Sequence, residues 1–156
     1  MIEVEVEDPA WTAVAEVERL AAEAAEAALR AARPGEDSGG LTILLTDDAT
    51  VHDLNARFRG KDKPTNVLSF PAPETAAPHL GDIALAHGVC AREAADQGKS
   101  LADHLRHLVL HGTLHLMGYD HEADSEAEAM EEMERRILAR LGVADPYRMD
   151  GADVGP

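Results

Sequence analysis

Apolar and polar residues alternate at the start of the chain, and further apolar runs predict strands later in the sequence. Ile2, Val4 and Val6 stand between acidic residues, which indicates a strand with one buried face. Two later runs, 41–46 and 66–70, are apolar on both faces, so we expect both to lie buried in a sheet. The expected strands are 2–6, 41–46, 66–70 and 80–86.

Apolar residues three or four positions apart predict five helices, whose ends carry residues with known capping preferences. Asp8 and Pro9 are suited to begin a helix, and we expect that helix to continue to about Arg33. The motif at 125–128 is a capping box that begins the last helix. The expected helices are 9–33, 48–60, one through Cys90 and Ala94 to about Gly98, 101–117, and 125–141.

The resulting order of elements, β-α-β-α-β-β-α-α-α, predicts an α/β (α+β) fold in a single layered domain. We expect a small mixed sheet of about four strands packed with about five helices. The chain shows no internal repeat and no long linker, so residues 1–144 are expected to form one domain. Residues 145–156 are rich in Pro, Gly and Asp and are expected to form a flexible tail.

The chain is strongly acidic, with 30 acidic and 14 basic residues and a formal net charge of −16. This charge argues against a protein that coats nucleic acid or binds anionic membranes, so any RNA role needs a local basic patch. We interpret the acidic runs 16–26 and 122–134 as solvated helix faces. Cys90 is the only cysteine, which excludes an intrachain disulfide and favours a cytoplasmic location without a disulfide partner or a membrane.

Three histidines near residue 115 have the spacing of a metal site. His111 and His115 are four residues apart on a predicted helix, so their imidazoles project from the same face. Gly118 ends that helix and lets the chain turn back, which brings His121 towards the other two. Three neutral imidazoles leave one tetrahedral position for water, as in catalytic zinc sites. The pattern predicts one zinc ion per chain, bound by His111, His115 and His121.

The spacing H-x-x-x-H-x-x-G-x-x-H is that of the zinc helix of the metzincin proteases. Those enzymes carry a general-base glutamate directly after the first histidine, where this chain has Gly112, so their peptidase mechanism is not predicted. His107 and His111 form a competing metal pair with the same spacing, although we expect His107 to pack or to orient a ligand. Asp120 is suited either to orient a histidine or to cap a turn.

A second unusual segment, 57–66, holds four of the 14 basic residues of the chain. Its cations are Arg57, Arg59, Lys61 and Lys63. A cationic loop of this kind could clamp a phosphate. It could equally be a solvated helix end, because cations favour helix C-termini. Charge alone leaves both interpretations open.

Three stretches together resemble the YbeY family of bacterial rRNA maturation factors. They are RGKDKPTNVLSFP at 59–71, LGDI at 80–83 and HGTLHLMGYDH at 111–121, within a resemblance that spans about 41–142. The resemblance implies a single-strand-specific, metal-dependent endoribonuclease. It further implies action in maturation of the 3′ end of the small-subunit (16S) rRNA and in ribosome quality control.

The same resemblance assigns roles to individual residues and partners. It implies zinc on the three histidines and a functional arginine at Arg59, which we expect to be catalytic, with Lys61 as an added substrate contact. The expected partners are RNA, ribosomal particles and assembly factors. Two alternatives remain open. A zinc metallopeptidase would need a carboxylate base from elsewhere in the chain, and a non-catalytic, zinc-containing ribosome-assembly module would cleave no RNA.

Overall fold

Four strands form one mixed β-sheet in the computed structural model, which describes residues 2–33, 39–119 and 124–146. The strands are β1 (Ile2–Val6), β2 (Gly40–Thr46), β3 (Val67–Pro71) and β4 (His79–Ala86). Their order in the sheet is β1-β2-β4-β3. β1, β2 and β4 run parallel, whereas β3 is antiparallel to β4. The predicted small mixed sheet is confirmed.

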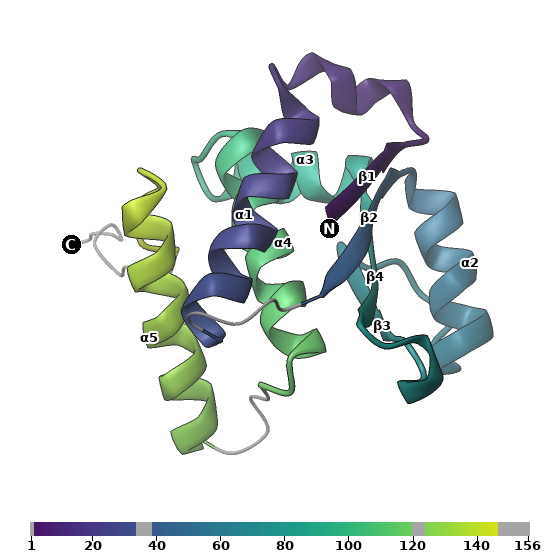
Figure 1. The fold of residues 1–156 in the computed structure, drawn as a ribbon. Helices are drawn as coiled ribbons and strands as arrows, with labels where there is room; N and C mark the ends of the chain where they lie inside the picture. The colour runs from purple at the N-terminus through teal and green to yellow at the C-terminus, as the bar shows by residue number, and fades with distance from the viewer. Residues whose placement is uncertain (1, 34–38, 120–123, 147–156) are drawn as a thin grey trace.

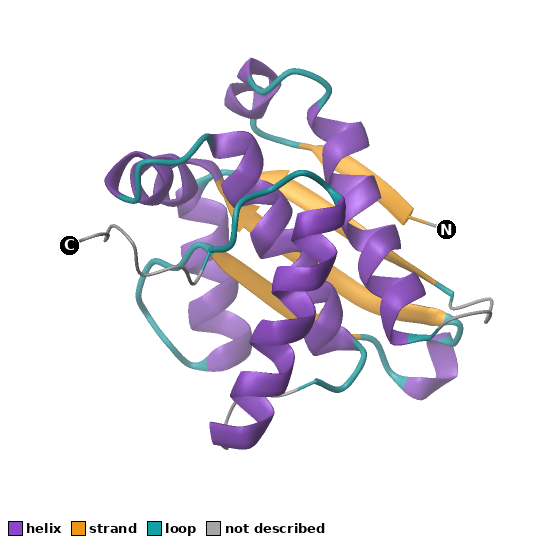
Figure 2. Ribbon diagram, turned by 90° about the vertical axis from the view of Figure 1, so that its left-hand side faces the viewer, coloured by secondary structure: helices purple, strands orange, loops and turns teal. Residues whose placement is uncertain are grey.

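Helices cover both faces of this sheet (Figures 1 and 2). The α-helices are α1 (Val17–Ala32), α2 (Asp48–Arg59), α3 (His87–Asp96), α4 (Leu101–Leu116) and α5 (Asp124–Arg140). Two short 3-10 helices are η1 (Pro9–Ala13) and η2 (Glu74–Ala76). α1 and α4 lie on one face with α5 outside them, and α2 lies on the other. The order of strands and α-helices along the chain matches the predicted order.

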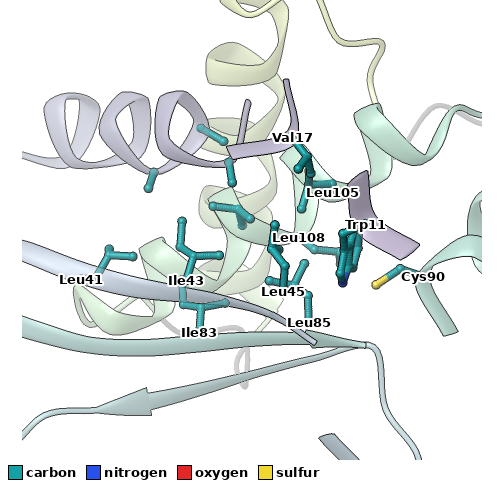
Figure 3. Close-up of a cluster of buried hydrophobic side chains, with 14 residues drawn as sticks. Trp11, Val17, Leu41, Ile43, Leu45, Ile83, Leu85, Cys90, Leu105 and Leu108 are labelled. Carbon is teal, nitrogen blue, oxygen red and sulfur yellow. The ribbon is translucent and has the colours of Figure 1, made fainter. Parts of the chain in front are cut away.

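The main core lies between the sheet and the pair α1 and α4 (Figure 3). Ile43, Leu45 and Leu85 of the central strands are fully buried there. α1 contributes small side chains, because Ala21 and Ala24 are also fully buried. Small residues at a contact let two helices approach closely, so α1 and α4 pack side by side over the sheet. Within the described residues, no helix is both long and apolar enough to cross a membrane.

The prediction of one continuous helix over 9–33 is wrong. The chain forms η1 over Pro9–Ala13, and α1 begins only at Val17 after Glu16 adopts a left-handed φ of 54°. The tertiary position of Trp11 explains the break. Its ring is fully buried, and its Nε1 donates a hydrogen bond to the carbonyl of Thr46 at 3.0 Å. Anchoring this large side chain at the end of β2 outweighs the local preference for one helix.

The prediction that 66–70 is a strand buried within the sheet is also wrong. β3 is the edge strand of the sheet, and among its residues only Leu68 is buried. The sequence is apolar on both sides because helices cover both faces of β3: Phe70 contacts Phe58 of α2, and Ser69 lies beside Gly112 of α4. The outer edge of the strand remains uncovered by another strand of the sheet, and it borders the site described next.

Candidate functional site

Three histidines lie along one face of α4, in consecutive turns of the helix. The ring centroids of His111 and His115 are 5.0 Å apart, and those of His107 and His111 are 6.3 Å apart. The helix is continuous from Leu101 to Leu116, and Ser100 caps its start by accepting a hydrogen bond from the backbone N–H of Asp103. The predicted presentation of His111 and His115 on one helix face is therefore present in the structure.

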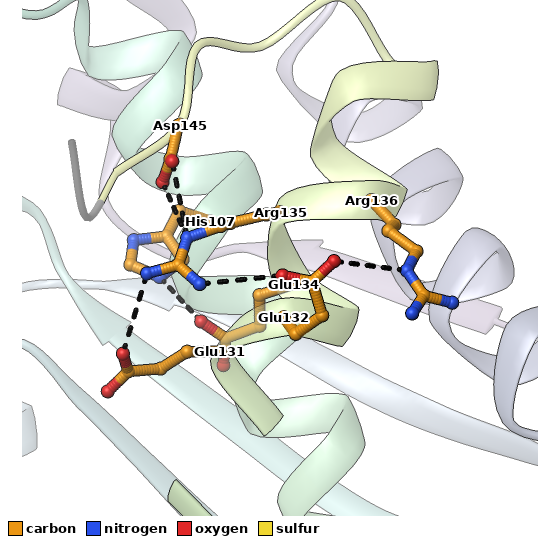
Figure 4. Close-up of polar contacts among 7 residues, drawn as sticks. All are labelled: His107, Glu131, Glu132, Glu134, Arg135, Arg136 and Asp145. Atoms are coloured by element: carbon orange, nitrogen blue, oxygen red, sulfur yellow. Dashed lines mark hydrogen bonds and ion pairs between the residues drawn. The ribbon is translucent and has the colours of Figure 1, made fainter. Parts of the chain in front are cut away.

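Glu134 of α5 joins two of these histidines (Figure 4 shows its contact with His107). One carboxylate oxygen is 3.0 Å from Nε2 of His107, and the other is 2.6 Å from Nδ1 of His111. The Glu134 side chain is 0 % exposed. The potential ligand atoms of His107, His111 and Glu134 all lie within 4.8 Å of one another, so this group could hold a metal ion.

Glu134 was not predicted as a site residue, because 122–134 was interpreted as a solvated helix face; this interpretation is wrong at position 134. The signal that could have identified Glu134 is its place on the apolar stripe of α5. It follows the buried Met130 by four residues and precedes the buried Ile137 and Leu138 by three and four. A carboxylate on a buried stripe needs compensating partners, which makes it a candidate for chemistry.

Gly112 follows His111 directly on α4 and lies against the sheet. It is buried, and a Cβ atom there would come within 3.0 Å of the Ser69 Oγ and 3.1 Å of the Ile83 Cδ1. A glutamate at this position would have to enter the packed interface between α4 and the sheet. The general base of a metzincin protease therefore has no room at position 112.

A cleft of about 790 Å³ opens between α4, β3 and the loop that follows α2. It brings together two candidate groups that lie far apart in the sequence, the histidines of α4 and the basic loop. Its lining includes His111, His115 and Tyr119 on one side, Val67, Ser69 and Pro71 of β3, and Asn55, Arg59, Lys61, Lys63 and Thr65. Arg57, the fourth cation of the segment, instead forms an ion pair with Asp53, with 3.3 Å between Nε and Oδ2.

The basic loop is held in place by the end of α2. Gly60 adopts a left-handed φ of 67°, which ends the helix and turns the chain between Arg59 and Lys61. Asn55 is 2 % exposed and donates from Nδ2 to the carbonyl of Lys63 at 2.9 Å. The backbone N–H of Lys61 donates to the carbonyl of Asn55 at 3.2 Å. These bonds fix the backbone that carries the cleft lysines.

A second polar network ties the start of β3 to α3 and α4, outside the cleft. Glu93 Oε1 accepts hydrogen bonds from Nδ2 of Asn66 at 2.9 Å and from Nε2 of His104 at 2.8 Å. Burial is the main cause that lowers the pKa of His104, although the contact with Glu93 opposes it. Burial, with smaller contributions from Glu93 and Asp48, raises the pKa of Cys90 to about 12, so this thiol is neutral near pH 7.

Two of the predicted site residues, Asp120 and His121, lie outside the described residues. The side chain of Ser125, the first residue of the predicted capping box, lies outside them as well. Of the remaining predicted residues, His111, His115, Arg59 and Lys61 line one cleft. His107 is not part of this cleft lining, and its Nε2 lies 3.0 Å from a carboxylate oxygen of Glu134.

The fold and the site define an α/β protein in which a histidine–carboxylate group that could hold a metal ion lies beside a cationic cleft. The sequence model of the family described as "Endoribonuclease YbeY" matches residues 2–142. The chain therefore belongs to the Endoribonuclease YbeY family, which confirms the resemblance seen in its motifs.

Relatives with that name cover nearly the whole chain. The Endoribonuclease YbeY of Maricaulis maris is 56 % identical over 155 residues, which are 99 % of this chain and 96 % of the relative. That of Rhodopseudomonas palustris strain BisB18 is 54 % identical over 144 residues, covering 88 % and 86 %. The solution structure of TM1509 from Thermotoga maritima matches with a TM-score of 0.58 and 24 % identity over 95 % of this chain and 99 % of its own. This last likeness supports the fold.

Proposed function

We propose that this chain is a zinc-dependent endoribonuclease that cleaves single-stranded RNA. In the cell, this endoribonuclease would act in maturation of the 3′ end of small-subunit (16S) rRNA and in ribosome quality control. The observation that carries the proposal is the single cleft that joins His111 and His115 to Arg59, Lys61 and Lys63. Membership in the Endoribonuclease YbeY family supports the reaction class.

The residues present fit a zinc ion. His111 and His115 offer imidazole nitrogens to the same cleft, and His111 is bonded through Nδ1 to a carboxylate, as metal-binding histidines commonly are. In this proposal His111, His115 and His121 would hold one zinc ion per chain. When bound, such an ion supplies a Lewis acid and makes a bound water more acidic.

The cations of the cleft would bind the phosphate backbone. Arg59 presents a planar guanidinium that can contact two phosphate oxygens at once, and it would stabilise the charge that grows on the phosphoryl group during cleavage. Lys61 would add a substrate contact as a point charge. His107 and Asp120 are proposed to orient the metal-binding histidines and not to bind the ion.

The net charge of −16 shapes the expected partners. Three cleft cations can neutralise only a few phosphates, so affinity for free RNA should be weak. Ribosomal particles and assembly factors would therefore be its partners and would present the RNA to the cleft. The protein would act in the cytoplasm, as expected from the sequence.

The test measures zinc content and RNA cleavage on the same preparations, before and after chelation and return of zinc. Substrates are a single-stranded RNA, the matching duplex and a peptide. His115→Ala should lose zinc and cleavage while remaining folded. His79→Ala is the control, because His79 is a partly exposed histidine on β4 that pairs with Asp82 outside the cleft lining.

Three outcomes would contradict the proposal. A folded His115→Ala protein that keeps stoichiometric zinc would remove the metal site. Cleavage of the peptide but not of RNA would favour a metallopeptidase, which the packing of Gly112 already disfavours. A folded, zinc-loaded protein that cleaves neither RNA nor peptide would favour a non-catalytic assembly module.

A further inference from the structure

We propose that Glu134 is a positioning residue that orients His111 for metal binding. One carboxylate oxygen of Glu134 accepts a hydrogen bond from Nδ1–H of His111, and His107 holds the other oxygen. The inference rests on the proposed function, because it takes His111 as a zinc ligand. It starts from the two short contacts of Glu134, at 3.0 Å to His107 and 2.6 Å to His111.

The location of Glu134 is costly for packing alone. Its neighbours on the stripe, Met130, Ile137 and Leu138, pack with Leu110 and Leu114 in an apolar cluster between α4 and α5. An apolar side chain would continue that cluster without burying a charge, whereas a carboxylate there needs hydrogen-bond donors for both oxygens. The two histidines of α4 supply these donors, so the contact explains why a carboxylate can stand in the core.

The hydrogen bond sets the tautomer of His111. A carboxylate accepts only, so the ring must carry its proton on Nδ1, and Nε2 then keeps the lone pair that a metal requires. The same bond fixes the rotation of the ring. His107 lies one turn earlier on α4, and its Nε2 contacts the other carboxylate oxygen of Glu134. This second contact holds the carboxylate in the orientation that faces His111.

A competing role for Glu134 is direct metal ligation with His107 and His111, since their ligand atoms lie within 4.8 Å of one another. Positioning is favoured by burial and by place. The Glu134 side chain is 0 % exposed, whereas His111 and His115 line the cleft that a substrate can enter. His111 therefore stands between the carboxylate on one side and the cleft on the other.

The test compares Glu134→Gln and Glu134→Asp with the control Glu128→Gln. Glu128 is exposed on the same helix, so its substitution removes the same charge without touching the histidines. Gln has the size of Glu, but its amide offers one acceptor and one donor end, so it cannot accept from both imidazoles. The measurements are the ring-nitrogen NMR shifts of His111 in the metal-free protein, zinc affinity by chelator competition, and single-turnover cleavage at saturating zinc.

Positioning predicts that wild-type His111 carries its proton on Nδ1 and that Glu134→Gln mixes the two tautomers. Zinc should still bind at one ion per chain in Glu134→Gln, with affinity lowered on the order of 10- to 100-fold. Glu134→Asp keeps a carboxylate and should recover part of that loss, while Glu128→Gln should match the wild type in every measurement.

Several results would overturn the inference. Loss of stoichiometric zinc in Glu134→Gln, together with its retention in His115→Ala, would make Glu134 a ligand. A change in thermal stability with unchanged zinc affinity and an unchanged His111 tautomer would make its role structural only. If Glu134→Gln fails to fold, the wild-type spectrum still decides, because a proton on Nε2 of His111 contradicts positioning.

The NMR measurement needs neither zinc nor RNA. A wild-type protein that binds no zinc would therefore refute the proposed function. The NMR spectrum of the metal-free protein would still test the hydrogen bond between Glu134 and His111.

Discussion

Gly112 of α4 lies so close to Ser69 of β3 that a Cβ atom at position 112 would stand 3.0 Å from the Ser69 Oγ. This contact seats the helix that carries His111 and His115 directly against the edge strand. Ser69 of β3 and the two histidines of α4 all line the cleft. The distance between α4 and β3, and with it the width of the cleft, therefore depends on the absence of a side chain at position 112.

Gly112→Ala should therefore destabilise the protein. Overpacking costs about 1–3 kcal/mol, and the better helix propensity of alanine returns up to about 1 kcal/mol, so we expect a net loss on the order of 1 kcal/mol. RNA cleavage should fall as well, because a shift of α4 away from β3 would displace the cleft histidines. Urea unfolding and single-turnover cleavage measure both effects. A variant more stable than the wild type would show that Ser69 and Ile83 yield without strain.

Arg59→Lys should lower the cleavage rate by on the order of 10²-fold or more, as expected for the loss of one preorganised contact to the transition state. Lysine keeps the charge but cannot contact two phosphate oxygens in the same plane. Zinc content and thermal stability should stay the same. Arg57→Lys is the matched control, because Arg57 is paired with Asp53. Equal cleavage by both variants would exclude Arg59 from the mechanism.

Asn55→Ala should weaken RNA binding without removing zinc. The substitution removes the hydrogen bond from Nδ2 to the Lys63 carbonyl and releases the loop that carries Lys61 and Lys63. The loss of one hydrogen bond of a buried amide should cost roughly 1–2 kcal/mol of stability. Fluorescence anisotropy with a short single-stranded RNA, alongside metal analysis, measures the effect. RNA affinity equal to that of the wild type would show that the loop keeps its position unaided.

The pH dependence of stability should carry a contribution from His104. Burial lowers its pKa in the folded state, so between the folded and unfolded pKa values the unfolded chain binds the extra proton. This contribution is present above the ordinary histidine pKa of ~6.5 and is lost as the pH falls through and below that value.

The measurement is urea unfolding at neutral pH and at about pH 5.5, where unfolded histidine is mostly protonated. The wild type should lose stability on acidification, and His104→Gln should lose less, whatever its absolute stability. His79→Gln serves as a control on a partly exposed histidine and should follow the wild type. Identical pH slopes for the wild type and His104→Gln would contradict the assignment.

Much of the fold could be predicted because its signals are local. Asp47 accepts a hydrogen bond from the N–H of Thr50 and caps α2, and Gly60 ends the same helix, close to the predicted range 48–60. The break before α1 could not be predicted, because it depends on a contact between Trp11 and Thr46, 35 residues away. The edge position of β3 was hidden for a related reason: helices on both faces give an edge strand the composition of a central one.

The candidate site shows the same division. The spacing of His111 and His115 follows from helical geometry, and the cations at 59–63 stand out by composition. Their meeting in one cleft depends on how α4 docks against β3, which no local pattern encodes. Glu134 was hidden in an acidic run, since its contact with His111 spans 23 residues and requires α5 to pack on α4.

The cations of the cleft are concentrated on one loop of a chain whose net charge is −16. A polyanion is therefore attracted to one small area and repelled by the protein as a whole. A long, rigid duplex brings many phosphates near the acidic surface at once, whereas a short flexible segment can enter the cleft with its flanks directed outward. If the proposed function holds, the charge distribution would thus select the direction of approach and the local shape of the RNA strand before any base is read.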